Sequence, residues 1–129
     1  MRHFCSLLLL TALIAIGGCQ SASHQTVSPE EFSQIISSQN DVQLLDVRTP
    51  AEYAEGHLPE AMLIDIKAGK FAEQAAQQLH HSHPVAVYCR SGKRSAMAAD
   101  TLAALGFKVL NLNGGITAWQ EQGLPIVIE

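Results

Sequence analysis

The architecture of this protein is indicated by one segment of its sequence, Val85-Ala86-Val87-Tyr88-Cys89-Arg90-Ser91-Gly92-Lys93-Arg94-Ser95. Its first four residues are apolar, and such a short run is typical of a buried strand. The Ala-rich stretch of residues 95–105 is followed by Gly106, which predicts a helix that ends there. The segment therefore predicts a strand, then a tight loop that begins at Cys89, then a helix.

Strands and helices are expected to alternate along the rest of the chain as well. Further helices are predicted at residues 28–38, 49–55, 69–79 and 116–122, and further strands at residues 42–47, 61–66, 109–112 and 126–128, the last of them at an edge. This alternation favours a single α/β domain with a mainly parallel central sheet and helices on both faces. Ligands bind such sheets beyond the carboxyl ends of the strands, which is where Cys89 is expected.

The composition excludes several classes of protein. A chain of 129 residues suits one domain of ordinary size. A net charge of −4 with 16% charged residues is typical neither of a disordered acidic tail nor of a basic nucleic-acid-binding protein, so we expect no nucleic-acid partner. The three cysteines, Cys5, Cys19 and Cys89, are too few and too widely spaced for a disulfide scaffold or a CxxC zinc module.

The first 18 residues have the pattern of a signal peptide. Arg2 precedes a nearly unbroken apolar run at residues 4–16. At about 13 residues, this run is shorter than the roughly 20 that a membrane-spanning helix needs. We therefore expect residues 1–18 to be removed.

The residues at the end of this leader, Ile16-Gly17-Gly18-Cys19, resemble the bacterial lipobox. The resemblance implies that Cys19 becomes the first residue of the mature chain and carries lipid, which anchors the protein to a membrane of the cell envelope, facing the periplasm. By resemblance, Gln20 favours the outer membrane. The alternative is ordinary cleavage after residues 21–23, which releases a soluble periplasmic protein. We expect residues 19–26 to form a lipid-attached tether and residues 27–129 to form the domain.

The loop after Cys89 combines features that stabilise an anion on the sulfur. Three cations, Arg90, Lys93 and Arg94, follow within five residues. The backbone N–H groups of a tight loop and the start of the next helix add positive potential. A free cysteine is only about 3% thiolate at pH 7, so a site that lowers its pKa creates a nucleophile. Cys89 is therefore the candidate nucleophile, and the alternative is an inert cysteine in an ordinary basic turn.

A series of motifs resembles those of the single-domain rhodanese family, in the family's order and at its spacing. The motifs are Leu44-Leu45-Asp46-Val47-Arg48-Thr49-Pro50-Ala51-Glu52-Tyr53, Gly56-His57-Leu58-Pro59-Glu60-Ala61, residues 87–95 of the segment quoted above, Leu105-Gly106-Phe107 and Asn113-Gly114-Gly115-Ile116-Thr117-Ala118-Trp119. The resemblance extends over residues 27–125 and implies a rhodanese-like fold.

The resemblance implies a thiosulfate sulfurtransferase with Cys89 as its catalytic residue and no cofactor. In this reaction the cysteine takes the outer sulfur of thiosulfate, releases sulfite, and passes the sulfur from a persulfide to cyanide or to a thiol. The expected substrate-binding residues are those of the loop, Arg90, Ser91, Gly92, Lys93, Arg94 and Ser95. Asp46 and Arg48 are expected to support the loop from the neighbouring strand end, and Glu52 and His57 are expected to be structural.

Two alternative functions remain open from the sequence. Cys-based phosphatases and arsenate reductases use a similar cysteine loop that ends in arginine, with five residues between the two, whereas Cys89 and Arg94 enclose four. The shorter loop leaves less room for a tetrahedral phosphate, which favours sulfur transfer. The other alternative is a non-catalytic, membrane-tethered rhodanese module that binds a partner; such modules commonly lack the cysteine, which this chain has.

A cluster of histidines, His80, His81 and His83, does not indicate a metal site. Its spacing is not the i, i+4 pattern of a helical metal site, and no cysteine or carboxylate pair lies beside it in the sequence. We expect a solvated loop there, without a bound metal.

Overall fold

The computed structural model describes residues 23–129. The expected signal peptide, residues 1–18, the expected lipid attachment at Cys19 and the first part of the tether lie outside the described residues. Within residues 23–129, no helix is long and apolar enough to span a membrane.

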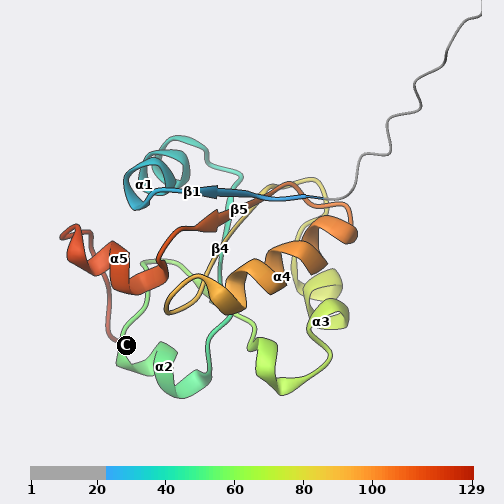
Figure 1. Ribbon diagram of the computed structural model, residues 1–129. Coiled ribbons are helices and arrows are strands. Elements are labelled where there is room, and N and C mark those ends of the chain that lie inside the picture. The colour runs from blue at the N-terminus through green and yellow to red at the C-terminus, as the bar shows by residue number, and fades with distance from the viewer. Residues whose placement is uncertain (1–22) are drawn as a thin grey trace, which may run out of the picture.

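A sheet of five parallel strands forms the centre of the domain (Figure 1). The strand order is β1-β5-β4-β2-β3, and all neighbours pair in parallel, which confirms the predicted sheet. All four residues of the central strand β4 are buried, as expected for a strand that is covered on both faces. The strands are β1 (Gln25–Val27), β2 (Gln43–Asp46), β3 (Met62–Leu63), β4 (Val85–Tyr88) and β5 (Val109–Leu112).

Helices cover both faces of the sheet, as predicted. Helices α1 and α5 pack on one face, helices α3 and α4 pack on the other, and α2 lies at one end of the domain (Figure 1). Crossover helices of this kind are what parallel neighbouring strands require. The helices are α1 (Pro29–Ser38), α2 (Pro50–Glu55), α3 (Phe71–Gln78), α4 (Lys93–Ala104) and α5 (Gly115–Glu121).

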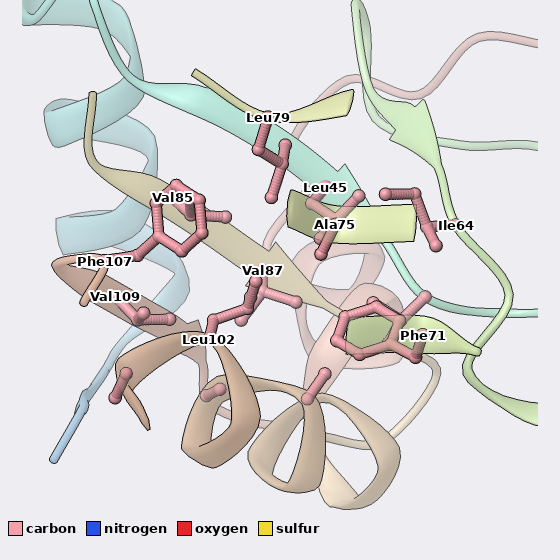
Figure 2. Close-up of a cluster of buried hydrophobic side chains, with 14 of the residues drawn as sticks. Leu45, Ile64, Phe71, Ala75, Leu79, Val85, Val87, Leu102, Phe107 and Val109 are labelled. Carbon is pink, nitrogen blue, oxygen red and sulfur yellow. The ribbon is translucent and has the colours of Figure 1, made fainter. Parts of the chain in front are cut away.

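Each face of the sheet has its own buried core, because successive side chains of a strand point to opposite faces. Val85 and Val87 of β4 belong to the core under α3 and α4, which Figure 2 shows. Ala86 and Tyr88 belong to the core under α1 and α5. Cys89 continues this alternation and lies on the α4 side, at the end of the strand.

The N-terminal edge of the sheet differs from the prediction. Gln25 and Thr26, which were expected in the tether, belong to β1, and β1 pairs with β5. Val27 is the only buried residue of this three-residue strand. A strand this short has no hydrophobic pattern of its own, so its position follows from pairing with β5.

The strand expected at residues 61–66 is reduced to the two residues of β3. The chain then turns into a 3₁₀ helix, η1 (Ile66–Ala68). Asp65 is its N-cap and accepts a hydrogen bond from the N–H of Lys67 at 2.8 Å. This capping bond stabilises the turn in place of a longer strand.

The expected edge strand at residues 126–128 is a single antiparallel bridge between His57 and Val127. Helix α4 also begins two residues earlier than expected, at Lys93. Gly92 takes a left-handed conformation at its N-cap, which a glycine adopts without steric cost. The chain can therefore enter the helix directly from the loop.

Candidate active site

The carboxyl ends of β2 and β4 bring the predicted site residues to one edge of the sheet. Asp46 of β2 lies beside Tyr88 of β4 in parallel register, so the residues that follow both strands leave the sheet on the same side. Cys89 follows β4 directly, and Arg48 lies two residues beyond β2. Sequence positions about 40 residues apart thus form one local site.

The side chain of Cys89 is fully buried at the start of the loop between β4 and α4. Its Sγ accepts a hydrogen bond from the N–H of Gly92 at 3.1 Å and another from the hydroxyl of Ser95 at 3.3 Å. Gly92 has a φ of 101°, which side-chain-bearing residues rarely adopt. The tight turn at this glycine keeps the start of α4 within reach of the sulfur.

These hydrogen bonds determine the acidity of Cys89. Burial raises the pKa of the thiol and is the largest single influence. The hydroxyl of Ser95 and the N–H groups of Ser95, Gly92 and Ser91 lower the pKa by more in total, and the result lies below the ordinary value for cysteine. Neutral donors of the loop therefore favour a thiolate at Cys89.

Asp46 and Arg48 form a buried ion pair beside the loop. Arg48 Nε lies 3.0 Å from both carboxylate oxygens of Asp46, and Arg48 Nη2 lies 2.7 Å from Asp46 Oδ2. Nη2 also donates to the carbonyl of Gly56 at 2.7 Å, and the guanidinium lies over the ring of Tyr88. Arg48 thus links the ends of β2 and β4 to the residue that follows α2.

A second ion pair, between Glu52 and Arg94, connects α2 to the first turn of α4. The two terminal nitrogens of the Arg94 guanidinium donate to the two carboxylate oxygens of Glu52 at 2.7 and 2.8 Å. These bonds, opposed by burial, lower the pKa of Glu52 to about 2. They also raise the pKa of Arg94, to which the nearby charge of Cys89 adds a smaller effect. Glu52 therefore holds Arg94 in place at the start of α4.

The remaining predicted substrate-binding residues lie at different depths. Arg90, Ser91 and Lys93 are exposed, so their side chains are accessible to a substrate that approaches the loop. Ser95 is fully buried beneath the sulfur. The loop therefore presents the cations Arg90 and Lys93 to the solvent and its hydrogen-bond donors to the sulfur.

Gly115 was not recognised from the sequence as a residue that shapes the loop. A Cβ at this position would overlap the carbonyl of Arg90 and would lie 2.5 Å from the carbonyl oxygen of Cys89. The N–H of Ile116 donates to the Cys89 carbonyl at 2.9 Å, and the N–H of Thr117 donates to the Arg90 carbonyl at 3.2 Å. The start of α5 therefore packs directly against the backbone of the loop, and only the adjacent glycines at 114–115 hinted at this approach.

A pocket of about 270 Å³ opens beside the loop. Its lining comes from the end of β2, from α2, from the loop residue Arg90, from α5 and from Ile126 near the C-terminus. Four of its lining side chains are charged: Arg48, Glu52, Glu55 and Arg90. The pocket is therefore polar and adjoins the residue after Cys89.

The histidines lie outside the loop. His57 is buried, its Nδ1 lies 2.8 Å from the carbonyl oxygen of Leu58, and its ring stacks on Tyr53 with the centroids 3.8 Å apart. His80 stacks on His83 at 4.0 Å. Among residues 23–129, no group of three or more histidine, cysteine or acidic side chains could hold a metal ion.

Comparisons with known proteins identify the family. The rhodanese-like domain model matches residues 28–122. A sulfurtransferase of Allochromatium vinosum is 40% identical over 102 residues, which cover 78% of this chain and 92% of that protein. Thiosulfate sulfurtransferase 18 of Arabidopsis thaliana is 35% identical over 127 residues, and the match covers 85% of this chain and 93% of that protein. A rhodanese-related protein from Thermoplasma volcanium, known from a crystal structure, is 29% identical in sequence and matches this fold with a TM-score of 0.72. The match covers 82% of this chain and all of that protein's chain. The chain therefore belongs to the rhodanese-like sulfurtransferase family.

Proposed function

We propose that this protein is a thiosulfate sulfurtransferase that carries sulfur as a persulfide on Cys89. The proposal rests on the surroundings of Cys89 Sγ, which lies at the end of the central strand and accepts hydrogen bonds from Gly92 and Ser95. Since these donors lower the pKa of the thiol, the reactive thiolate is more populated than in a free cysteine. The relative described as a thiosulfate sulfurtransferase supports the choice of sulfur donor.

The first half-reaction loads the cysteine. The thiolate of Cys89 attacks the outer sulfur of thiosulfate, the sulfur–sulfur bond of thiosulfate breaks, and sulfite leaves with the bonding electron pair. A persulfide anion remains on Cys89. In the second half-reaction, cyanide or a thiolate attacks the terminal sulfur, which leaves as thiocyanate or as a new persulfide and restores the thiolate of Cys89.

The loop residues have distinct roles in this reaction. The N–H groups of residues 90–95 stabilise the terminal sulfur anion of the persulfide, and those of Ser91, Gly92 and Ser95 also stabilise Sγ. The accessible side chains of Arg90 and Lys93 attract the thiosulfate dianion. Arg94 adds positive potential from its fixed position beside Glu52. Asp46 and Arg48 support the loop from the end of β2.

A Cys-based phosphatase or arsenate reductase fits this geometry less well. Such an enzyme needs the arginine at the end of its loop to bind an oxyanion. Here both terminal nitrogens of Arg94 already donate to Glu52. Together with the short loop between Cys89 and Arg94, this pairing favours sulfur transfer over phosphate chemistry.

The test is the intact mass of a chain that begins at Gln20, measured after incubation with thiosulfate and again after cyanide. The native protein is expected to gain about 32 Da, the mass of one sulfur atom, and to lose it to cyanide as thiocyanate. Cys89→Ser is expected to gain nothing because it lacks the nucleophile. No gain in the native protein, with hydrolysis of an aryl phosphate instead, would support the phosphatase. If the protein shows neither sulfur transfer nor phosphate hydrolysis, the non-catalytic binding module becomes the favoured function.

We also propose that lipid on Cys19 anchors the mature protein to a bacterial membrane, on the periplasmic side and with the outer membrane favoured. The proposal rests on the leader and on the lipobox-like residues 16–19. The mass of the protein extracted from membranes tests it, because a lipidated chain begins at Cys19 and carries acyl groups. An unmodified chain that begins at His24 would overturn the anchor and indicate a soluble periplasmic protein.

A further inference from the structure

The pocket beside the Cys89 loop contains two charged side chains that form no ion pair within residues 23–129. Arg48 and Glu52 each form one of the ion pairs described above, so their charges are balanced. Arg90 and Glu55 also line the pocket, and both are exposed. Within the described part of the chain, the pocket therefore presents one free cation and one free carboxylate to a ligand.

The remaining lining sets the size and the character of this ligand. Ile116 and Ile126 provide apolar surface, and the side chains of Thr117 and Gln120 provide polar groups. Pockets for drug-sized ligands have volumes of about 300–1,000 Å³. A pocket of about 270 Å³ suits a smaller molecule, which carries one charged group of each sign and little apolar surface.

The position of the pocket connects it to sulfur transfer. Arg90 follows Cys89 in the chain, and its carbonyl is held by the N–H of Thr117 at 3.2 Å. Both Arg90 and Thr117 line the pocket. A molecule bound there lies next to the loop that carries the persulfide.

We propose that this pocket binds the sulfur acceptor, and that the acceptor is a small thiol with both an ammonium and a carboxylate group, such as free cysteine. The inference rests on the proposed persulfide of Cys89. Glu55 would bind the ammonium group, Arg90 would bind the carboxylate, and the two isoleucines would contact the methylene group that carries the thiol. Thiols without a charged group, such as 2-mercaptoethanol, would make neither ionic contact.

The transfer step needs no further reactant. The thiolate of the acceptor attacks the terminal sulfur of the Cys89 persulfide and forms a new sulfur–sulfur bond. The bond between Cys89 Sγ and that sulfur breaks, and its electron pair stays on Sγ. The products are the persulfide anion of the acceptor and the thiolate of Cys89, so charge and electrons balance.

The experiment follows the second half-reaction alone. Cys89 is loaded with sulfur from thiosulfate, the excess is removed, and the loss of about 32 Da is followed by intact mass after a thiol is added. The four thiols are free cysteine with both charges, cysteamine with the ammonium only, 3-mercaptopropionate with the carboxylate only, and 2-mercaptoethanol with neither. Each variant is compared with the native protein for the same thiol, so that differences in thiol reactivity cancel.

Two variants of Glu55 and one control separate the ionic contact from general damage. Glu55→Gln is expected to slow transfer to cysteine and cysteamine by about threefold to fivefold, the effect of one partly exposed ion pair, and to leave 2-mercaptoethanol unchanged. Glu55→Lys is expected to slow transfer to these two thiols further and to increase the rate of transfer to 3-mercaptopropionate. Misfolding would not produce such an increase. Glu73→Gln removes an exposed carboxylate on α3, outside the pocket, and is expected to change none of the four rates.

The outcomes distinguish the two proposals. If the native protein gains no sulfur from thiosulfate, the proposed function fails and this inference fails with it. If the persulfide forms and is transferred, but both Glu55 variants keep the native ratios among the four thiols, only the inference about the acceptor is overturned. The inference is supported if the Glu55 variants slow transfer only to cysteine and cysteamine, and if Glu55→Lys accelerates transfer to 3-mercaptopropionate.

Discussion

Two opposing influences act on the thiol of Cys89. Burial among apolar neighbours disfavours a charged sulfur, whereas the hydrogen bonds from the loop favour it. The donors that contact Sγ are the hydroxyl of Ser95 and the N–H of Gly92, not the cations that make this loop conspicuous in the sequence. The exposed cations Arg90 and Lys93 have the role of attracting the substrate in the function we propose. In that proposal, activation of the sulfur and attraction of the substrate are tasks of different residues.

Replacing Ser95 with alanine is expected to raise the pKa of Cys89, because one donor to the thiolate is lost. The thiolate is the reactive form and its fraction increases as the pH rises through this pKa. The acid limb of kcat/KM for thiosulfate should therefore move to higher pH in Ser95→Ala, with activity at pH 6 falling severalfold. Ser38→Ala, on the exposed surface of α1, serves as the control. An unchanged acid limb in Ser95→Ala would show that the hydroxyl does not stabilise the thiolate.

Two helices hold the loop from outside. Helix α2 is linked to α4 through Glu52 and Arg94, and helix α5 contacts the loop backbone through its first turn. The second contact depends on Gly115, since a side chain there would overlap the carbonyls of Cys89 and Arg90. The loop is thus shaped by its neighbouring elements as well as by its own residues.

Replacing Gly115 with alanine is expected to destabilise the domain by about 1–3 kcal/mol, because the new Cβ must displace packed backbone. The persulfide should also form much more slowly, since the displaced carbonyls belong to the loop. Urea unfolding and the mass gain from thiosulfate measure the two effects.

The matched control for this substitution is Gly123→Ala. Gly123 also has a positive φ, 71° against 61° for Gly115, but a Cβ at Gly123 would meet no atom of residues 23–129 within 4 Å. The control therefore reports backbone strain without crowding. Equal loading rates in the two variants would contradict a role of close packing at Gly115.

The whole domain is one sheet with a buried core on each face, so the two cores are expected to unfold together. The single tryptophan, Trp119, lies in the core under α1 and α5. Leu102 lies in the opposite core, under α4 (Figure 2). The fluorescence of Trp119 therefore shows whether a substitution in the core under α3 and α4 also affects unfolding of the core on the other face of the sheet.

Leu102→Ala is expected to lower the free energy of unfolding by about 2–5 kcal/mol, the cost of a cavity in a packed core. The urea transition followed by Trp119 fluorescence should shift together with the transition followed by far-UV circular dichroism. Met97→Ala, on the same helix but 64% exposed, should change the stability by less than about 0.5 kcal/mol. A fluorescence transition that stays in place while the dichroism transition shifts would show that the two cores unfold separately.

Local sequence was enough to predict most of the architecture and to single out the loop after Cys89 as the candidate site. The buried strand before Cys89, the helix after it and the alternation of strands and helices follow from the properties of neighbouring residues, and the structure confirms the parallel sheet with helices on both faces. The cysteine, the glycine and the cations of the loop are also neighbours in the chain, so their proximity could be read directly. Hydrophobic periodicity and turn composition are short-range properties, which is why they are visible in a single sequence.

Contacts between distant residues could be found only in the folded chain. Glu52 and Arg94, which form an ion pair, are 42 residues apart in the chain. Strand β1 is placed by its pairing with β5. Position 115 needs a glycine because the carbonyl groups of Cys89 and Arg90, from a distant part of the chain, pack against it. The free charges of the pocket are likewise known only once the ion pairs of its other residues are seen. No local pattern encodes these contacts, because they form only when packing of both cores brings separate elements together.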